Sequence, residues 1–223
     1  MTRQPTLSDL LRRLTEKRRE RYKKSLQRRL HNTTPTIIGN NCVCGMIYRD
    51  LNLPYLSPTA NVLIGANDFF ELVSDLPHYL TCPLEQTTLE GTAYPVGILR
   101  KESKQVLLRF MHDSSFEEAR DKWTRRCSRV QWDNLYIVFH QEFPRQRIRL
   151  GKKNHWHKKF KNIPYSNKRM LVNTWLSFDK EIVPLSKWFF FKGINALNYP
   201  TQYSKKRLID QFQYIRFLNH KTK

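Results

Sequence analysis

Residues 36–51, TIIGNNCVCGMIYRDL, set the pattern of the chain. A short apolar run is followed by a turn with a glycine at each end, and then by residues that favour a helix. A proline-containing loop and a second apolar run, residues 61–64, come next. Strand, turn, helix, loop and strand in this order are typical of α/β proteins.

The same alternation continues along the chain. Apolar periodicity predicts helices over 67–80 and 115–130, and strands over 93–99, 104–112, 134–141 and 169–175. We therefore expect a three-layer α/β fold around a mainly parallel sheet with flanking helices. A basic run beginning at Arg145 is a candidate border between two similar halves, 33–143 and 144–223. Near the end, helical spacing links Leu208, Phe212, Ile215 and Leu218.

The first segment of the chain differs from the rest. Residues 6–31 are predicted to form a basic amphipathic helix, because Thr6 can cap it and four leucines keep helical spacing: Leu7, Leu10, Leu11 and Leu14. We treat 1–32 as a helical arm and 33–223 as the α/β domain. The arm either lies on an anionic membrane surface or packs on its own domain with a solvated charged face.

The charge of the chain is strongly positive but unevenly placed. Forty Lys and Arg against nineteen Asp and Glu give a formal charge of +21, which predicts attraction to a polyanion. Residues 1–32 carry eleven basic and three acidic side chains, and residues 135–223 carry nineteen and four. The middle, 33–134, holds ten and twelve. The positive charge therefore lies outside the segment with the chemical motifs.

The expected cellular compartment follows from the small number of cysteines and from the absence of long apolar runs. Four cysteines at irregular spacing are too few for a disulfide scaffold, so reduced thiols are expected. No signal-peptide pattern and no window of eighteen uninterrupted apolar residues is present. We expect a cytoplasmic protein, peripheral to the inner face of the cytoplasmic membrane.

A thiol and an imidazole are the candidate catalytic residues. Cys42 lies on the predicted strand-to-helix turn, where a helix N-terminus favours a thiolate and an anionic ligand. His112 ends another predicted strand and could reach the same sheet edge as a base. The structural alternative makes Cys42 a small buried residue at a crowded turn and His112 a backbone hydrogen-bonding partner.

Several polar and aromatic residues could bind substrate around this pair. Asn40 and Asn41 either cap the turn or present amides to sugar hydroxyls. Arg125 and Arg126 either clamp an anionic group or lie on a solvated helix face. Aromatic and amide side chains that could line the same rim are Trp123, Trp132 and Asn134.

The sequence gives no positive sign of a metal or a cofactor. Structural zinc sites typically place about two to four residues between paired cysteines, whereas Cys42 and Cys44 are separated by one. His155 and His157 lie in a basic run that we interpret as a solvated loop. Walker, Rossmann, Gly-x-Ser-x-Gly and His-Glu-x-x-His signatures are absent. No cofactor and no metal is expected.

Residues 40–64 resemble a bacterial family of exopolysaccharide biosynthesis proteins, domain of unknown function number nineteen-nineteen. The resemblance begins with Asn-Asn-Cys before a glycine and with Ser-Pro-Thr at 57–59 before a strand. It continues through RFMH at 109–112, WTRR at 123–126 and NL at 134–135, and covers 35–175. Cys44 and Asp113 depart from the family pattern, which has a small residue and an aromatic residue there.

The resemblance implies an α/β fold of two similar halves and a role in envelope polysaccharide assembly, without an established reaction. We expect a transferase acting on a lipid-linked sugar precursor, with acyl transfer through Cys42 and His112 as the most concrete chemistry. Glycosyl or phosphate-group transfer is an alternative. A non-catalytic partner of polysaccharide-assembly proteins is a second hypothesis. A nucleic-acid-binding protein is a third and less favoured one, since no named binding motif is present.

Overall fold

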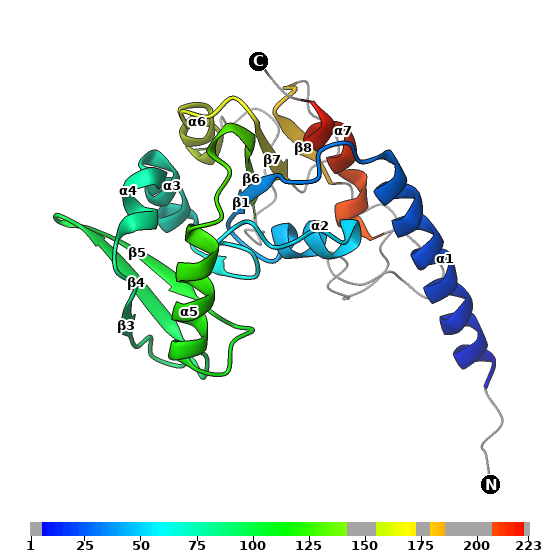
Figure 1. The fold of residues 1–223 in the computed structure, drawn as a ribbon, viewed down its shortest axis with the longest axis horizontal. Helices are drawn as coiled ribbons and strands as arrows, with labels where there is room; N and C mark the ends of the chain where they lie inside the picture. The colour runs from blue at the N-terminus through cyan, green and yellow to red at the C-terminus, as the bar shows by residue number, and fades with distance from the viewer. Residues whose placement is uncertain (1–5, 142–154, 173–178, 186–206, 221–223) are drawn as a thin grey trace, which may run out of the picture.

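The computed structural model describes residues 6–141, 155–172, 179–185 and 207–220. In this part of the chain seven α-helices accompany two four-stranded sheets (Figure 1). The helices are α1 (Leu7–Arg29), α2 (Val43–Leu51), α3 (Ala66–Ser74), α4 (Leu76–Thr81), α5 (Phe116–Cys127), α6 (His155–Lys161) and α7 (Tyr214–Asn219), with 3-10 helices η1 (Trp132–Asn134) and η3 (Leu208–Gln211).

One sheet is parallel and the other is antiparallel. The parallel sheet has the order β1-β6-β7-β8, with β1 (Thr36–Gly39), β6 (Leu135–Gln141), β7 (Lys168–Val172) and β8 (Ile182–Pro184). The antiparallel sheet has the order β2-β5-β4-β3, with β2 (Leu63–Ile64), β3 (Glu85–Thr87), β4 (Val96–Lys101) and β5 (Lys104–Arg109). The α/β class is confirmed, but the strands expected in a single, mainly parallel sheet are divided between two sheets.

The parallel sheet is buried on both faces, as continuous apolar strands require. Alternate residues belong to different cores because side chains alternate across a strand. Ile37, Tyr136 and Val138 pack with residues of α1, α2 and α7. Ile38, Ile137 and Phe139 pack with residues of α3, α4 and α5 and with the antiparallel sheet. Helices therefore cover both faces of this sheet.

The antiparallel sheet is an insertion between two neighbours of the parallel sheet. β1 and β6 pair directly, yet the whole antiparallel sheet, four α-helices and the 3-10 helix η1 separate them in sequence. Strands of the parallel sheet come from both sides of residue 143. The described strands therefore do not divide into halves at 33–143 and 144–223.

Three local expectations are corrected by the structure. The helix expected over 67–80 is two helices, because the backbone leaves helical geometry at Asp75 (φ −148°, ψ 60°) and Pro77 lies in the first turn of the next helix. The tail helix is a 3-10 turn, η3, followed by α7. The basic run around His155 is helix α6 rather than a loop, since Phe160 is fully buried and Trp156 stacks on Phe70 at 5.5 Å.

Helix α1 has a docked half and an exposed half. Leu26 is 4% exposed and joins the core formed with α2 and α7, whereas Leu7 is 73% exposed. Figure 1 shows the N-terminal half of α1 extending beyond the body of the molecule. The second half of the expected arm is thus part of the α/β domain.

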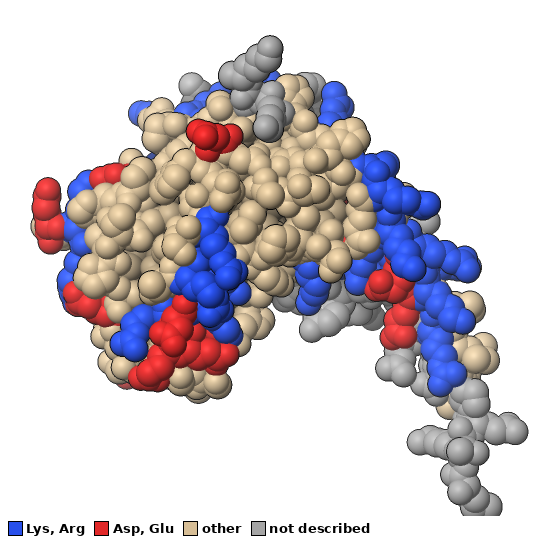
Figure 2. Space-filling model, in the orientation of Figure 1, with Lys and Arg blue, Asp and Glu red and all other residues tan. Residues whose placement is uncertain are grey.

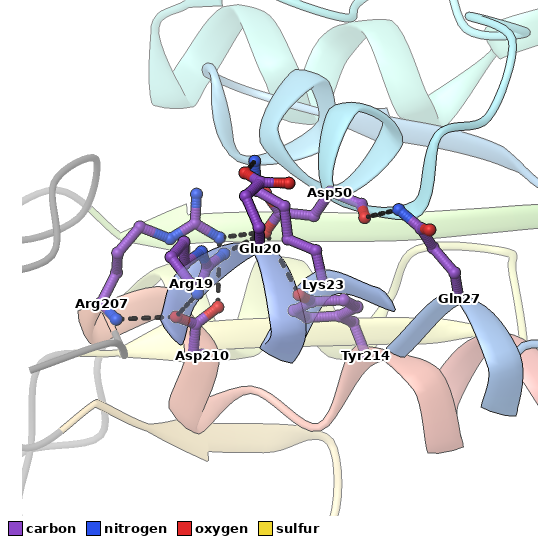
Figure 3. Close-up of polar contacts among 8 residues, drawn as sticks. All are labelled: Arg19, Glu20, Lys23, Gln27, Asp50, Arg207, Asp210 and Tyr214. Atoms are coloured by element: carbon purple, nitrogen blue, oxygen red, sulfur yellow. Dashed lines mark hydrogen bonds and ion pairs between the residues drawn. The ribbon is translucent and has the colours of Figure 1, made fainter. Parts of the chain in front are cut away.

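A buried ionic network holds α1 in place (Figure 3). Arg19 donates to Asp50 of α2 and to Asp210 of η3, both at 2.5 Å, and Arg207 also pairs with both carboxylates. The Tyr214 hydroxyl donates to Asp50 at 3.3 Å. Burial alone would lower the pKa of Arg19, but the Asp210 and Asp50 carboxylates outweigh it and raise that pKa. Two arginines and two aspartates make the network neutral.

Candidate active site

The turn between β1 and α2 carries the candidate nucleophile. Cys42 occupies the N-cap position of α2, and its carbonyl accepts the first helical hydrogen bond from the Met46 N–H at 2.9 Å. The side chain is partly exposed. The positive end of the helix dipole lies at this position and favours a thiolate over a thiol.

The antiparallel sheet delivers the imidazole to this thiol. The Ile64 N–H donates to the Asn40 carbonyl at 2.8 Å, which joins β2 to the turn. β2 in turn pairs with the end of β5, so the residues that follow β5 lie beside Cys42. The Cys42 Sγ and His112 Nε2 atoms are 3.2 Å apart, and His112 is exposed. The two side chains are close enough for direct proton transfer.

A second histidine, His140, organises the turn and was missed from the sequence. The Asn41 Nδ2 lies 2.9 Å from His140 Nδ1, and the Asn40 amide exchanges hydrogen bonds with the His140 backbone at 2.9 and 2.8 Å. His140 lies near the end of β6, the neighbour of β1. The sequence feature that selected His112, a histidine at the end of a predicted strand, would also have selected His140.

The two asparagines have structural partners for both ends of their amides. Besides its contact with His140, Asn41 accepts a hydrogen bond from the Val43 N–H at 3.1 Å. Asn40 and Asn41 are 5% and 4% exposed. Their polar atoms already bond within the protein, which favours the alternative in which they shape the turn over a role in binding sugar hydroxyls.

Cys44 and Gly45, which follow Cys42 in the same segment, serve close packing. Cys44 is fully buried against Gly39, where a Cβ atom would lie 2.3 Å from the Cys44 sulfur. Burial raises the pKa of the Cys44 thiol far above its ordinary value. A Cβ on Gly45 would lie 1.8 Å from the Asn61 side chain, so only glycine allows the 57–62 loop to approach α2 this closely.

The three residues of α5 that were predicted to bind substrate have different surroundings. Trp123 is 3% exposed and belongs to the core, so it offers no stacking wall to a ligand. Arg125 is exposed. Arg126 donates to the Ala60 carbonyl at 2.9 Å and its guanidinium lies 5.0 Å from the centre of the Tyr55 ring. Arg126 thus braces the loop that leads to β2.

Electrostatics connect Arg126 with the residue next to His112. Burial lowers the pKa of Arg126, and the Asp113 carboxylate opposes this shift. Asp113 is itself paired with Lys122 at 2.7 Å. The positive charge of Arg126 is therefore within electrostatic reach of the loop that carries His112.

Trp132 and Asn134 lie at the opposite end of the parallel sheet from Cys42. β1 and β6 are parallel, with Thr36 opposite Leu135, so the start of β6 lies at the start of β1. Cys42 follows the other end of β1. Asn134 bonds there to Asn32 and Thr34, and Trp132 is 48% exposed. These two residues do not share a rim with the Cys42–His112 pair.

We expect Cys42 to be the most reactive of the four cysteines toward iodoacetamide near neutral pH. Burial raises the pKa of Cys44, Cys82 and Cys127, that of Cys127 to about 12, which lowers their thiolate fractions. Peptide mapping by mass spectrometry after timed alkylation measures all four rates. His112→Ala should slow Cys42 selectively; equal rates at Cys42 and Cys82 would contradict a thiol activated by its surroundings.

Comparison with known proteins places this geometry in a family. The model for "Domain of unknown function (DUF1919)" matches residues 14–219. The chain belongs to this family. The match spans both sheets, the Cys42–His112 pair and the ionic network, so these features lie within the DUF1919 domain. It begins inside α1, before the docked half of that helix.

A curated relative shares nearly the whole DUF1919 chain. An uncharacterized protein of Haemophilus influenzae is 30% identical over 213 residues, which cover 91% of this chain and 94% of the relative. Within the described residues of the present protein, no helix combines the length and apolar character needed to cross a membrane.

Proposed function

We propose that this DUF1919 protein is a Cys–His transferase that passes an acyl group to a hydroxyl group of a carbohydrate. The observation that carries the proposal is the 3.2 Å approach of the Cys42 sulfur to His112 Nε2 at the N-terminus of α2. A partly exposed thiol, an adjacent imidazole and a helix dipole are the components of an activated sulfur nucleophile.

The reaction has two steps that share one base. His112 takes the proton of Cys42, the sulfur attacks the carbonyl carbon of an acyl thioester, and the donor thiolate leaves with a proton returned by His112. In the second step His112 takes the proton of the acceptor hydroxyl, whose oxygen attacks the Cys42 thioester. The S–C bond breaks and Cys42 regains its proton. The partial positive charge at the start of α2 favours the oxyanion in both steps.

The choice of a carbohydrate as the acceptor is supported by the family resemblance and not by the geometry of the site. The resemblance to exopolysaccharide biosynthesis proteins favours a sugar hydroxyl on an envelope polysaccharide precursor, carried on a lipid. The acyl group is chosen over glycosyl or phosphate transfer because a cysteine–histidine pair is suited to attack on a carbonyl carbon.

Intact-mass spectrometry tests the first step without knowledge of the acceptor. The protein is incubated with acetyl and longer acyl thioesters of coenzyme A, without any carbohydrate. We expect a mass increase of one acyl group, localised to Cys42 by peptide mapping and removed by hydroxylamine. Cys42→Ser should abolish the hydroxylamine-sensitive adduct, and Cys82→Ser should leave it unchanged as the matched control.

The same experiment separates the enzyme from a non-catalytic partner. Wild-type protein that gains no acyl group from any donor, or gains it equally in Cys42→Ser, would contradict the thiol mechanism. Co-purification of a glycosyltransferase with both wild type and His112→Ala would then favour a role in the assembly machinery.

A further inference from the structure

Helix α1 has one continuous outer face whose chemistry changes along its length. Positions seven residues apart lie on nearly the same side of a helix. Leu7 and Leu14 are followed at this spacing by Arg21 and Arg28, and Leu10 is followed by Lys17 and Lys24. The face is therefore apolar over its first two turns and basic over the rest.

The side chains of this face are exposed. Leu7, Leu10, Leu11 and Leu14, which we call the leucine tip, are 73%, 45%, 38% and 51% exposed. Lys17, Arg21, Lys24 and Arg28, which we call the basic stem, are exposed as well. Figure 2 shows Lys and Arg side chains in a row along α1. Tip and stem together extend about 30 Å, at 1.5 Å per residue.

The acidic side chains described on α1, Glu16 and Glu20, point away from the leucine tip. At 100° per residue, Glu16 and Glu20 point roughly 150° away from the leucine tip. Both are exposed, and Glu20 pairs with Lys23 at 2.7 Å. Glu20 lies four residues from Lys24, and thus only about 40° from it around the helix. The leucine tip is therefore clear of both carboxylates, while Glu20 borders the basic stem, where Lys23 neutralises it.

The domain holds this face outward. The docked side of α1 carries Arg19 and Leu26, which are 6% and 4% exposed and bind the ionic network and the core. By helical spacing the tip and stem lie on a different side. Arg21, Lys24 and Arg28 also line a groove of about 490 Å³ along the helix. α1 is thus fixed at one end and presents its outer face to solvent.

We propose that the outer face of α1 docks on an anionic phospholipid bilayer, with the leucine tip inserted among acyl chains and the basic stem over the phosphate headgroups. Apolar side chains that enter a bilayer beside basic side chains that contact headgroups are the two components of an interfacial helix. The proposal narrows the membrane-binding element to residues 7–28 and to one face. It does not depend on the chemistry of Cys42.

Two other occupants fit the face less well. A second copy of the chain would need apolar residues over three or four heptads, whereas Arg21 and Arg28 continue the Leu7 and Leu14 positions and would repel their counterparts. A nucleic acid would contact the basic stem but would leave four exposed leucines without an apolar partner.

The test uses sedimentation of the full chain with phosphatidylcholine vesicles that contain phosphatidylglycerol, and with phosphatidylcholine vesicles alone. Arg21→Gln, Lys24→Gln and Arg28→Gln together should weaken binding about 100-fold, given the usual strength of a basic side chain near an anionic membrane. Leu10→Ser and Leu14→Ser should each weaken it at least about tenfold, and the loss should persist at high salt.

Two controls keep the outcome decisive. Arg120→Gln, Arg125→Gln and Arg129→Gln remove the same charge from exposed positions in and just after α5 and should change binding little. Circular dichroism confirms that each variant is folded. Equal losses from the α1 and α5 charge variants, unchanged binding of the leucine variants, or equal binding to neutral vesicles would overturn the proposal. Dimerisation that the leucine variants abolish would instead identify a second copy as the occupant.

Discussion

Asp50→Ala is expected to lower the free energy of unfolding by about 3–5 kcal/mol, because it leaves two buried arginines without one of their two carboxylates. Arg19 and Arg207 both pair with Asp50, whose side chain is 1% exposed, and Tyr214 donates to it as well. Urea denaturation followed by far-ultraviolet circular dichroism measures the change. The loss should also loosen α1, since the Asp50 carboxylate joins Arg19 of α1 to α2.

A surface pair on the same helix provides the control. Lys23 and Glu20 lie 2.7 Å apart, but the Glu20 side chain is 61% exposed. Lys23→Ala should therefore change the free energy of unfolding by no more than about 1 kcal/mol. If Asp50→Ala is as mild as Lys23→Ala, water must reach the network and the buried arrangement is wrong.

The local elements of the α/β fold could be predicted from the sequence, but their assignment to sheets could not. The strand at 36–38 and the helix at 46–51 were predicted because local apolar spacing decides them. Strand direction depends on which segments meet after folding. The antiparallel sheet is built on the pairing of β4 with β5, and the short β2 joins it at the edge by pairing antiparallel with β5. Nothing in a two-residue strand distinguishes parallel from antiparallel partners.

The helix expected over 6–31 is present as α1, but the sequence did not show where it docks on the domain, for a related reason. Helical spacing over 6–31 is uniform in sequence, yet Arg19 marks the point where the helix enters the domain. Its partners Asp50 and Asp210 are 31 and 191 residues away. An arginine that pairs at such separations looks like any other basic residue of a charged helix.

Within the site, the proximity of Cys42 and His112 was predicted for a reason that is only half right. Both residues follow strands, as expected, but the strands belong to different sheets. The Asn40 carbonyl bridges the sheets through Ile64, and this backbone contact has no sequence signature. Trp132 and Asn134 were misplaced because they precede β6, and the ends of parallel strands are separated by the length of the sheet.

If the proposed acyl transfer is correct, His112→Ala should slow formation of the Cys42 thioester by about 10²–10⁴-fold, the usual contribution of a general base. Cys42→Ala should reduce turnover at least as much, since no sulfur remains to attack the donor. Rates are measured at fixed donor concentration, by intact mass for the thioester and by release of free coenzyme A for turnover. Both variants alter partly or fully exposed side chains, so their unfolding transitions should stay close to wild type.

The double variant distinguishes a catalytic pair from two independent residues. Residues that act as a unit are non-additive, so Cys42→Ala with His112→Ala should lose no more activity than Cys42→Ala alone. Two independent contributions would multiply instead. His112→Ala with an unchanged acylation rate would make the 3.2 Å contact a packing feature of the turn. A slowed rate in a variant of normal stability would assign His112 to the chemistry, because a merely structural histidine would change stability first.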